Sequence, residues 1–218
     1  MTPEVEAFVG GTVTPLVDLL RFPMYNVLSD IERIKLAITL LKAVLKFHST
    51  PWWPAWWGLK DALIFHRTDA DFSMSLRTLH LNAEIEHRDL ATVNAGSRPP
   101  PSTASIGRGD YLTQEAVQHA MENHGIRNLT LYGVGVALLE IGLWVRIPWE
   151  DHVQVRRKTA RLSFLGRQYR TATKRLIDCD FGLAIEDIND PRLQQAIFQS
   201  SVAELESLLS KIQIDDDS

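Results

Sequence analysis

One short segment gathers most of the aromatic residues that could form a binding wall. Four of the six tryptophans lie between Trp52 and Trp57, with His48 before them and His66 after them. Two prolines within the segment prevent a regular helix. Because ligand pockets are lined by aromatic side chains with a few polar groups among them, the segment predicts an apolar wall beside imidazole groups. Packing of the indoles as a corner of the core is the simpler alternative.

The rest of the sequence carries no set of nucleotide-binding, metal-binding or redox motifs that would indicate cofactor chemistry. A reaction that requires only shape fits such a chain, since a pocket that holds a diene against its dienophile lowers the entropic part of the barrier. One hydrogen-bond donor to a conjugated carbonyl would add electrostatic stabilisation. We therefore predict a cofactor-independent cyclase, a pericyclase, that performs an intramolecular Diels–Alder reaction on an apolar small molecule.

The side chains expected to serve this reaction come from separate parts of the chain. Tyr132, His48 and His66 are the candidate catalytic donors. The candidate substrate-binding residues are all tryptophans: Trp52, Trp53, Trp56, Trp57 and Trp144. Each group has a structural alternative, because Tyr132 and Trp144 could pack in the core and His48 could cap the helix that precedes it.

The sequence does not indicate a metal site, nucleic-acid binding or export from the cell. The seven histidines include only one loosely spaced pair, His119 and His124, and no metal site is expected. Cys179 is the only cysteine, which excludes an internal disulfide and favours a reducing compartment. The formal charge of -4 offers no basic footprint for nucleic acid. The first residues lack the pattern of a signal peptide, so we expect a cytoplasmic protein.

An apolar helix over residues 129–144 is expected to organise the fold. The run is hydrophobic on nearly every face, which is typical of a helix buried on all sides. Three glycines would let neighbouring backbones approach closely: Gly133, Gly135 and Gly142. Glu140 lies in the middle of the run and requires a partner. The length alone fits a membrane span, but Glu140 and the closing Arg146 and Pro148 favour the core of a helical domain.

Further helices complete a mainly all-α domain over residues 1–218. Ser29 and Glu32 form a capping box that starts an amphipathic helix running to about Phe47. Asp190 and Pro191 form the N-cap and first position of the last helix. The other expected elements are a kinked helix over residues 3–20, a helix or short strand over 59–65, a short strand over 79–85, a mobile loop over 94–110, one or two helices with many basic residues over 150–177, and a frayed tail over 213–218.

Two short motifs match the catalytic parts of protein kinases. Residues 87–90 read His-Arg-Asp-Leu with Asn94 after them, as in the catalytic loop, and residues 180–182 read Asp-Phe-Gly, as in the magnesium-binding triplet. The triplet should follow the loop closely, whereas here the apolar helix separates them. The glycine-rich phosphate loop, the Val-Ala-Ile-Lys strand and the Ala-Pro-Glu motif are missing, so we predict no kinase activity and an accidental match at residues 87–94.

The order of helices resembles the large lobe of a protein kinase. Residues 131–141, Leu-Tyr-Gly-Val-Gly-Val-Ala-Leu-Leu-Glu-Ile, resemble the central helix of that lobe, with Thr130 in place of its aspartate. The chain is also similar to a fungal, all-helical family of unknown function that often follows HeLo-type prion-inhibition or cell-death domains. The segments that carry this likeness begin at Phe47, Gly135, Cys179 and Val202.

That family brings no catalytic residues, so the resemblance implies a second candidate function. This alternative is a catalytically inactive, kinase-like interaction module with a face for a partner or for a homo-oligomer. As a small helical protein without cofactors, the chain also resembles in overall type the norbornene-forming Diels–Alder cyclases of sordarin-type fungal terpenoid pathways. This second resemblance implies fungal secondary metabolism and an apolar, terpenoid-like substrate.

Overall fold

The computed structural model describes residues 12–23, 28–50, 53, 57–66, 79–81 and 121–216. In this structure the apolar run forms the central helix α5 (Leu129–Leu143). Every residue from Leu131 to Gly142 is buried. The side chain of Asn128 caps the start of α5 by accepting a hydrogen bond from Leu131 N at 2.9 Å. The helix ends at Trp144, which takes the left-handed conformation at φ 52°. The prediction of a helix buried on all sides is therefore confirmed.

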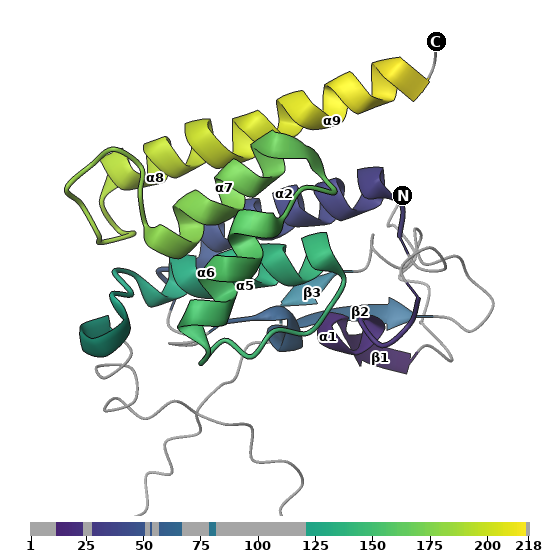
Figure 1. Ribbon diagram of the computed structural model, residues 1–218, viewed down its shortest axis with the longest axis horizontal. Helices are drawn as coiled ribbons and strands as arrows, with labels where there is room; N and C mark the ends of the chain where they lie inside the picture. The colour runs from purple at the N-terminus through teal and green to yellow at the C-terminus, as the bar shows by residue number, and fades with distance from the viewer. Residues whose placement is uncertain are drawn as a thin grey trace, which may run out of the picture.

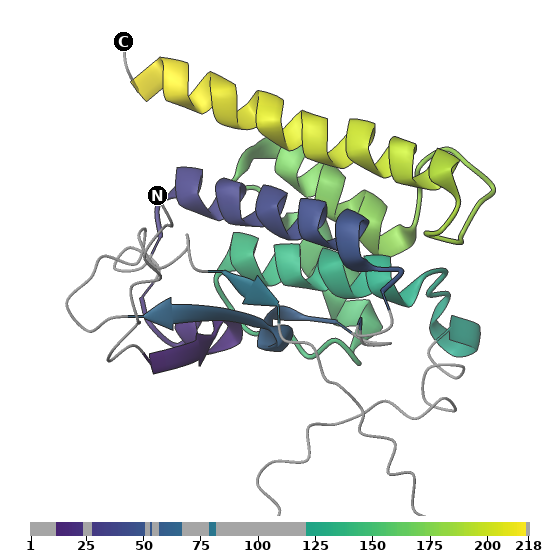
Figure 2. The same cartoon turned by 180° about the vertical axis from the view of Figure 1, so that it is seen from behind.

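Two helices enclose α5. Figures 1 and 2 show α2 (Asp30–Phe47) on one side of it and α7 (Gly166–Asp178) on the other, and α7 makes its most extensive contact. The backbones of α5 and α7 approach so closely at Gly135 that a Cβ there would lie 2.6 Å from Ile177 Cγ1. Tyr169 of α7 donates a hydrogen bond to the carbonyl of Leu138 at 2.8 Å. Close backbone approach was the role expected for the glycines, and Gly135 confirms it.

The charged residues inside this core have partners. Glu140 Oε1 accepts a hydrogen bond at 2.9 Å from the backbone N–H of Ile147, just beyond the end of α5. Arg33 of α2, which is 1% exposed, donates to the carbonyl of Gly142 at 3.1 Å and forms an ion pair with Asp30. A guanidinium at the last carbonyls of a helix stabilises its negative end. Arg33 therefore joins α2 to the end of α5.

The remaining helices follow the predicted caps. The capping box of Ser29 and Glu32 is present at the start of α2. The segment 150–177 forms two helices, α6 (His152–Arg161) and α7, and Gly166 at φ 87° begins the second of them. Asp190 caps α8, with proline at its first position. Helix α8 (Pro191–Ile197) continues through the π-helical turn η4 (Phe198–Val202) into α9 (Ala203–Asp216), which covers α2 and α7 (Figure 1).

A three-stranded antiparallel sheet lies on the side of α5 away from α9 (Figure 2). Its strands are β1 (Thr12–Pro15), β2 (Ala62–His66) and β3 (His80–Leu81), with Val13 opposite Phe65 and Ala62 opposite Leu81. A short helix, α1 (Leu16–Leu19), follows β1, and a 3-10 turn, η2 (Leu59–Asp61), precedes β2. The mainly helical class with a short β element is confirmed.

The helix expected over residues 3–20 is wrong where residues 12–15 form β1. Three β-branched residues there, Thr12, Val13 and Thr14, pair with β2 instead, and only α1 is helical. Helix α9 continues to Asp216, within the segment expected to fray. The predicted loop over 94–110 and the kinase-like match at 87–94 lie outside the described residues. Of the helices in the described ranges, none combines the length and hydropathy needed to cross a bilayer.

Candidate functional site

The tryptophan segment contributes a stacked pair to the core. Trp53 and Trp57 lie with their ring centroids 5.7 Å apart and their planes at 19°, and Trp57 is 1% exposed. The indole nitrogens of both are buried and have no hydrogen-bond partner. Trp52 and Trp56 lie outside the described residues. Of the four tryptophans in this segment, the two that the structure describes, Trp53 and Trp57, thus pack as a corner of the core.

Of the two expected histidine donors, the structure describes the side-chain contacts of His48 and only the backbone of His66. His48 is the C-cap of α2, where its Nδ1 lies 3.1 Å from the carbonyl of Val44 and its Nε2 lies 3.3 Å from the amide nitrogen of Gln194. The backbone of His66 ends β2 opposite Thr12, and its side chain lies outside the described part of the structure. The capping alternative for His48 is the one that its contacts support.

Tyr132 and Trp144 lie at opposite ends of α5. At a rise of about 1.5 Å per residue, the two are roughly 18 Å apart along the helix axis. The indole N–H of Trp144 donates to the carbonyl of Phe22 at 2.9 Å. The structure therefore does not bring these two side chains onto one pocket wall.

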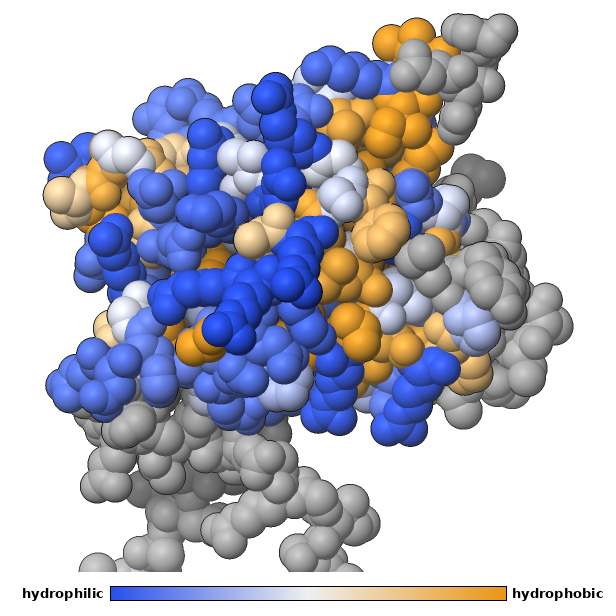
Figure 3. Space-filling view, in the orientation of Figure 1, coloured by the Kyte–Doolittle hydropathy of each residue, from blue (hydrophilic) through white to orange (hydrophobic). Residues whose placement is uncertain are grey.

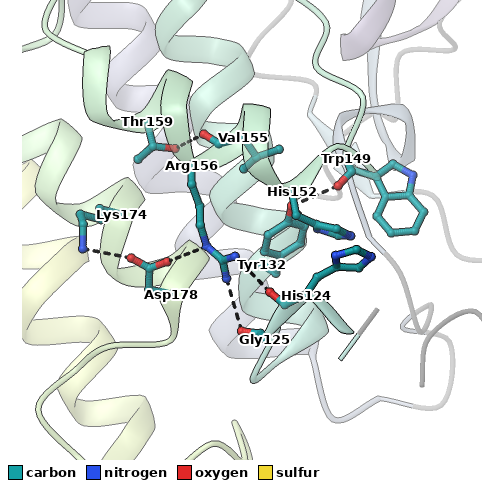
Figure 4. Close-up of polar contacts among 10 residues, drawn as sticks. All are labelled: His124, Gly125, Tyr132, Trp149, His152, Val155, Arg156, Thr159, Lys174 and Asp178. Carbon is teal, nitrogen blue, oxygen red and sulfur yellow. Dashed lines mark hydrogen bonds and ion pairs between the residues drawn. The ribbon is translucent and has the colours of Figure 1, made fainter. Parts of the chain in front are cut away.

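Tyr132 instead joins a cluster that forms where the chain turns from α5 into α6. The Oη atom of Tyr132 lies 3.0 Å from the carbonyl oxygen of Trp149 and 2.8 Å from Nδ1 of His152 (Figure 4). Both side chains are almost completely buried, at 0% and 4% exposed. His152 is the first residue of α6, and Asp151 caps that helix by accepting from Gln154 N at 2.9 Å. Two helix ends thus fix the phenol and the imidazole relative to each other.

The two short contacts of Oη assign the protons. A carbonyl oxygen can only accept, so the single phenol proton is directed at Trp149 O. The contact with His152 is then a hydrogen bond only if Nδ1–H donates to Oη. This arrangement leaves Nε2 of His152 unprotonated. Nε2 has no hydrogen-bond partner among the described residues and is not one of their fully buried, unpaired side-chain atoms.

Aromatic rings surround the imidazole of His152. The ring of His124 lies against it with a centroid distance of 4.2 Å and an interplanar angle of 30°, and Trp149 meets it edge-on at 6.1 Å. Arg156 holds the segment that carries His124, donating to the carbonyls of His124 at 3.0 Å and Gly125 at 3.4 Å (Figure 4). Arg156 also pairs with Asp178 at 3.4 Å. The cluster therefore holds Nε2 of His152 in a fixed position among aromatic rings.

Burial keeps both polar groups of the cluster neutral near pH 7. It lowers the pKa of His152 from its ordinary value of 6.5 to about 4, and the nearby His124 and Arg156 act in the same direction. Burial also raises the pKa of the Tyr132 phenol well above its ordinary value. At neutral pH the site presents an imidazole that accepts hydrogen bonds or protons, rather than a cation.

His152 and Trp149 were missed by the sequence reasoning. The available signal was the position of His152 immediately after the N-cap Asp151, close behind the apolar helix that carries Tyr132. The residues of the Asp-Phe-Gly triplet lie in the loop after α7, where Asp180 is exposed and Gly182 adopts φ 72°. No group of three or more metal-binding side chains occurs within the described ranges.

Comparison of the chain with protein families, curated proteins and solved structures found no match.

Proposed function

We propose that the protein is a cofactor-independent enzyme that acts on an apolar small molecule, with the Tyr132–His152 pair as its polar group. The observation that carries this proposal is the pair of contacts from Tyr132 Oη to Trp149 O and to His152 Nδ1, which leaves Nε2 of His152 as an acceptor with no partner in the described part of the chain. A neutral imidazole that is oriented through its other nitrogen is the usual arrangement of a general base or hydrogen-bond acceptor. Here Tyr132 and the carbonyl of Trp149 provide the orientation.

A cyclisation is the reaction class that suits one acceptor among aromatic rings. An imidazole that accepts a hydrogen bond from a hydroxyl or enol of the substrate increases the electron density of the conjugated system attached to that oxygen. The rings of His124 and Trp149 lie against the imidazole and give this acceptor aromatic surroundings. Binding of the folded substrate supplies the entropic part of the rate increase, as in an intramolecular Diels–Alder closure. The sequence predicted a side chain that donates a hydrogen bond to a carbonyl of the substrate. Here we propose instead that His152 accepts a hydrogen bond from a hydroxyl of the substrate.

Ligand-dependent thermal unfolding is the first test. A ligand that binds only the folded state raises the unfolding midpoint in proportion to its affinity and concentration. We expect hydroxylated terpenoids or polyenes to raise the midpoint, and ATP with magnesium to leave it unchanged. A shift with nucleotide alone, or no shift with any apolar compound, would overturn the proposal.

Variants then identify the acceptor. His152→Gln and Tyr132→Phe should lower turnover of a bound compound at least tenfold, while His48→Gln, which changes a helix cap, should leave turnover unchanged. Comparable unfolding midpoints for the variants would exclude a general loss of structure. Loss of turnover in His48→Gln but not in His152→Gln would assign the reaction to the C-terminal end of α2 and contradict the proposal.

The second candidate function, an inactive kinase-like interaction module, is supported by the order of elements. In chain order, a long helix α2, the antiparallel pair β2 and β3 and the buried α5 follow one another, an order that resembles the one expected for the large lobe of a kinase. This candidate predicts no small-molecule shift and a molecular mass in solution that rises with concentration. Light scattering together with the thermal measurement therefore distinguishes the two candidates.

A further inference from the structure

The segment that forms α6 and α7 is strongly basic although the whole chain is acidic. Residues 152–177 contain eight of the 23 lysines and arginines and no aspartate or glutamate, whereas the formal charge of the chain is -4. Net charge alone hides such a surface, because acidic residues elsewhere cancel it. An anionic partner is attracted mainly by the charges within a Debye length of about 10 Å, so the local cluster of cations matters more than the net charge of the chain.

Most of these cations have no acidic partner. Arg156 and Lys174 share Asp178, at 3.4 Å and 3.0 Å, and Arg175 donates to the carbonyl of Ser200 at 3.0 Å. The other five form no ion pair with any carboxylate in the described ranges: Arg157, Lys158, Arg161, Arg167 and Arg170. Their charge is therefore available to a partner from outside the chain.

The helices direct these charges away from the core. In α6, His152, Val155 and Thr159 are buried, so Arg157 and Arg161, one turn apart, lie on the opposite side. In α7, Tyr169 and its buried neighbours face α5, which leaves Arg167 exposed. Figure 3 shows the most hydrophilic side chains, in the deepest blue, gathered near the centre of the face that α6 and α7 form.

A large hydrophobic residue is exposed in the loop that joins the two basic helices. Phe164 lies in the connection between α6 and α7, between Arg161 and Arg167, and is 72% exposed. Val153, on the outer side of α6, is 58% exposed. We define the α6–α7 cationic surface by the unpaired cations and this aromatic residue: Arg157, Lys158, Arg161, Phe164, Arg167 and Arg170. An aromatic ring next to several unpaired cations gives this surface both charge and an apolar group, the combination found in interfacial helices.

We infer that the α6–α7 cationic surface docks on the surface of a bilayer that contains anionic phospholipid. The cations would contact lipid headgroups while Phe164 enters the interface below them, which is the combination of signals that peripheral membrane binding requires. A single projecting aromatic side chain fits this role better than it fits single-stranded nucleic acid, where successive bases stack on several aromatic rings. The inference does not depend on the proposed enzymatic function.

Vesicle co-sedimentation of the full chain tests this inference. We expect binding to phosphatidylcholine vesicles with about 30 mol % phosphatidylserine and no binding to phosphatidylcholine alone. Binding should weaken steeply as NaCl rises from about 0.05 M to about 0.5 M, because the interaction is screened. Arg161→Gln with Arg167→Gln should weaken binding about 25-fold, since each cation near an anionic surface contributes about a factor of five.

Matched variants separate this surface from general charge and hydrophobicity. Lys35→Gln with Lys211→Gln removes two exposed cations elsewhere and should change binding less than threefold. Phe164→Ala should weaken binding several-fold without changing its salt dependence, whereas Phe22→Ala, at a side chain that is 53% exposed elsewhere, should have no effect. Equal binding to neutral vesicles, an equal effect of the control pair, or binding of single-stranded RNA in place of vesicles would overturn the inference.

Discussion

Two buried ionisable residues should make the stability of this protein respond to pH in opposite directions. Burial raises the pKa of Glu140 from 4.5 to about 7, although the hydrogen bond from Ile147 opposes the change. Burial lowers the pKa of His152 from 6.5 to about 4. Glu140 thus stabilises the fold below pH 4.5, and this contribution is lost as the pH rises to about 7. His152 stabilises the fold above pH 6.5, and this contribution is lost as the pH falls to about 4.

The two contributions are of similar size. One pKa unit corresponds to about 1.4 kcal/mol, so each shift changes the free energy of unfolding by up to about 3 kcal/mol. Between pH 4.5 and 6.5 the slopes have opposite signs and largely cancel. The wild type should therefore be nearly flat in this window as far as these two groups are concerned.

Removing one group should reveal the slope of the other. Glu140→Gln retains an oxygen that accepts from Ile147 and should raise the free energy of unfolding at pH 8 by up to about 3 kcal/mol, with little change at pH 4. In that variant the stability should climb by about 1.4 kcal/mol per pH unit from pH 4.5 to 6.5. His152→Gln should show the reverse slope.

Urea unfolding followed by tryptophan fluorescence at a series of pH values measures these free energies. Glu186→Gln, at a side chain that is 58% exposed, is the matched control for loss of a carboxylate and should keep the wild-type profile. A Glu140→Gln profile parallel to that of the wild type would refute the reasoning, because it would mean that Glu140 titrates alike in the folded and unfolded chain.

Three further predictions concern the core. Gly135→Ala should lower the free energy of unfolding by about 2 kcal/mol or more, because the added Cβ would lie 2.9 Å from the backbone nitrogen of Ile177. Gly182→Ala has open space around it and should cost only about 1 kcal/mol, the strain of φ 72°. Chemical denaturation compares the two variants. Cys179 should resist iodoacetamide at pH 8 until the protein is unfolded, because burial raises its pKa to about 11; rapid labelling of the native protein, seen by mass spectrometry, would contradict this. Arg33→Met should lower the thermal midpoint through loss of a charge-assisted hydrogen bond of about 2 kcal/mol to Gly142, and an unchanged midpoint would show that α5 ends without help from α2.

The elements that local sequence signals define were predicted correctly. The capping box at Ser29, the cap at Asp190 with proline after it, and the uniformly apolar run of α5 depend only on neighbouring residues, and all three are present. Strand β1 was missed because its partner, β2, lies about 50 residues away in the chain. The apolar spacing of its residues fits a helix equally well until that partner is known.

The candidate site was predicted in part. Tyr132 was recognised as a polar group on the buried helix, but its partner His152 follows a turn whose course depends on how α6 packs. The tryptophan segment attracted attention through its composition. Composition does not distinguish indoles that line a cavity from indoles that stack on one another, as Trp53 and Trp57 do.

The uniformly apolar surface of α5 has a consequence for the order in which the protein can fold during synthesis. Helix α7, its most extensive partner, ends at Asp178, which is translated well after Leu143. At translation rates of about 5 to 20 residues per second, α5 waits roughly 2 to 7 s for the segment that covers it. Throughout that interval the nascent chain presents this apolar segment without its main cover, and ribosome-associated chaperones would meet it before its partner does.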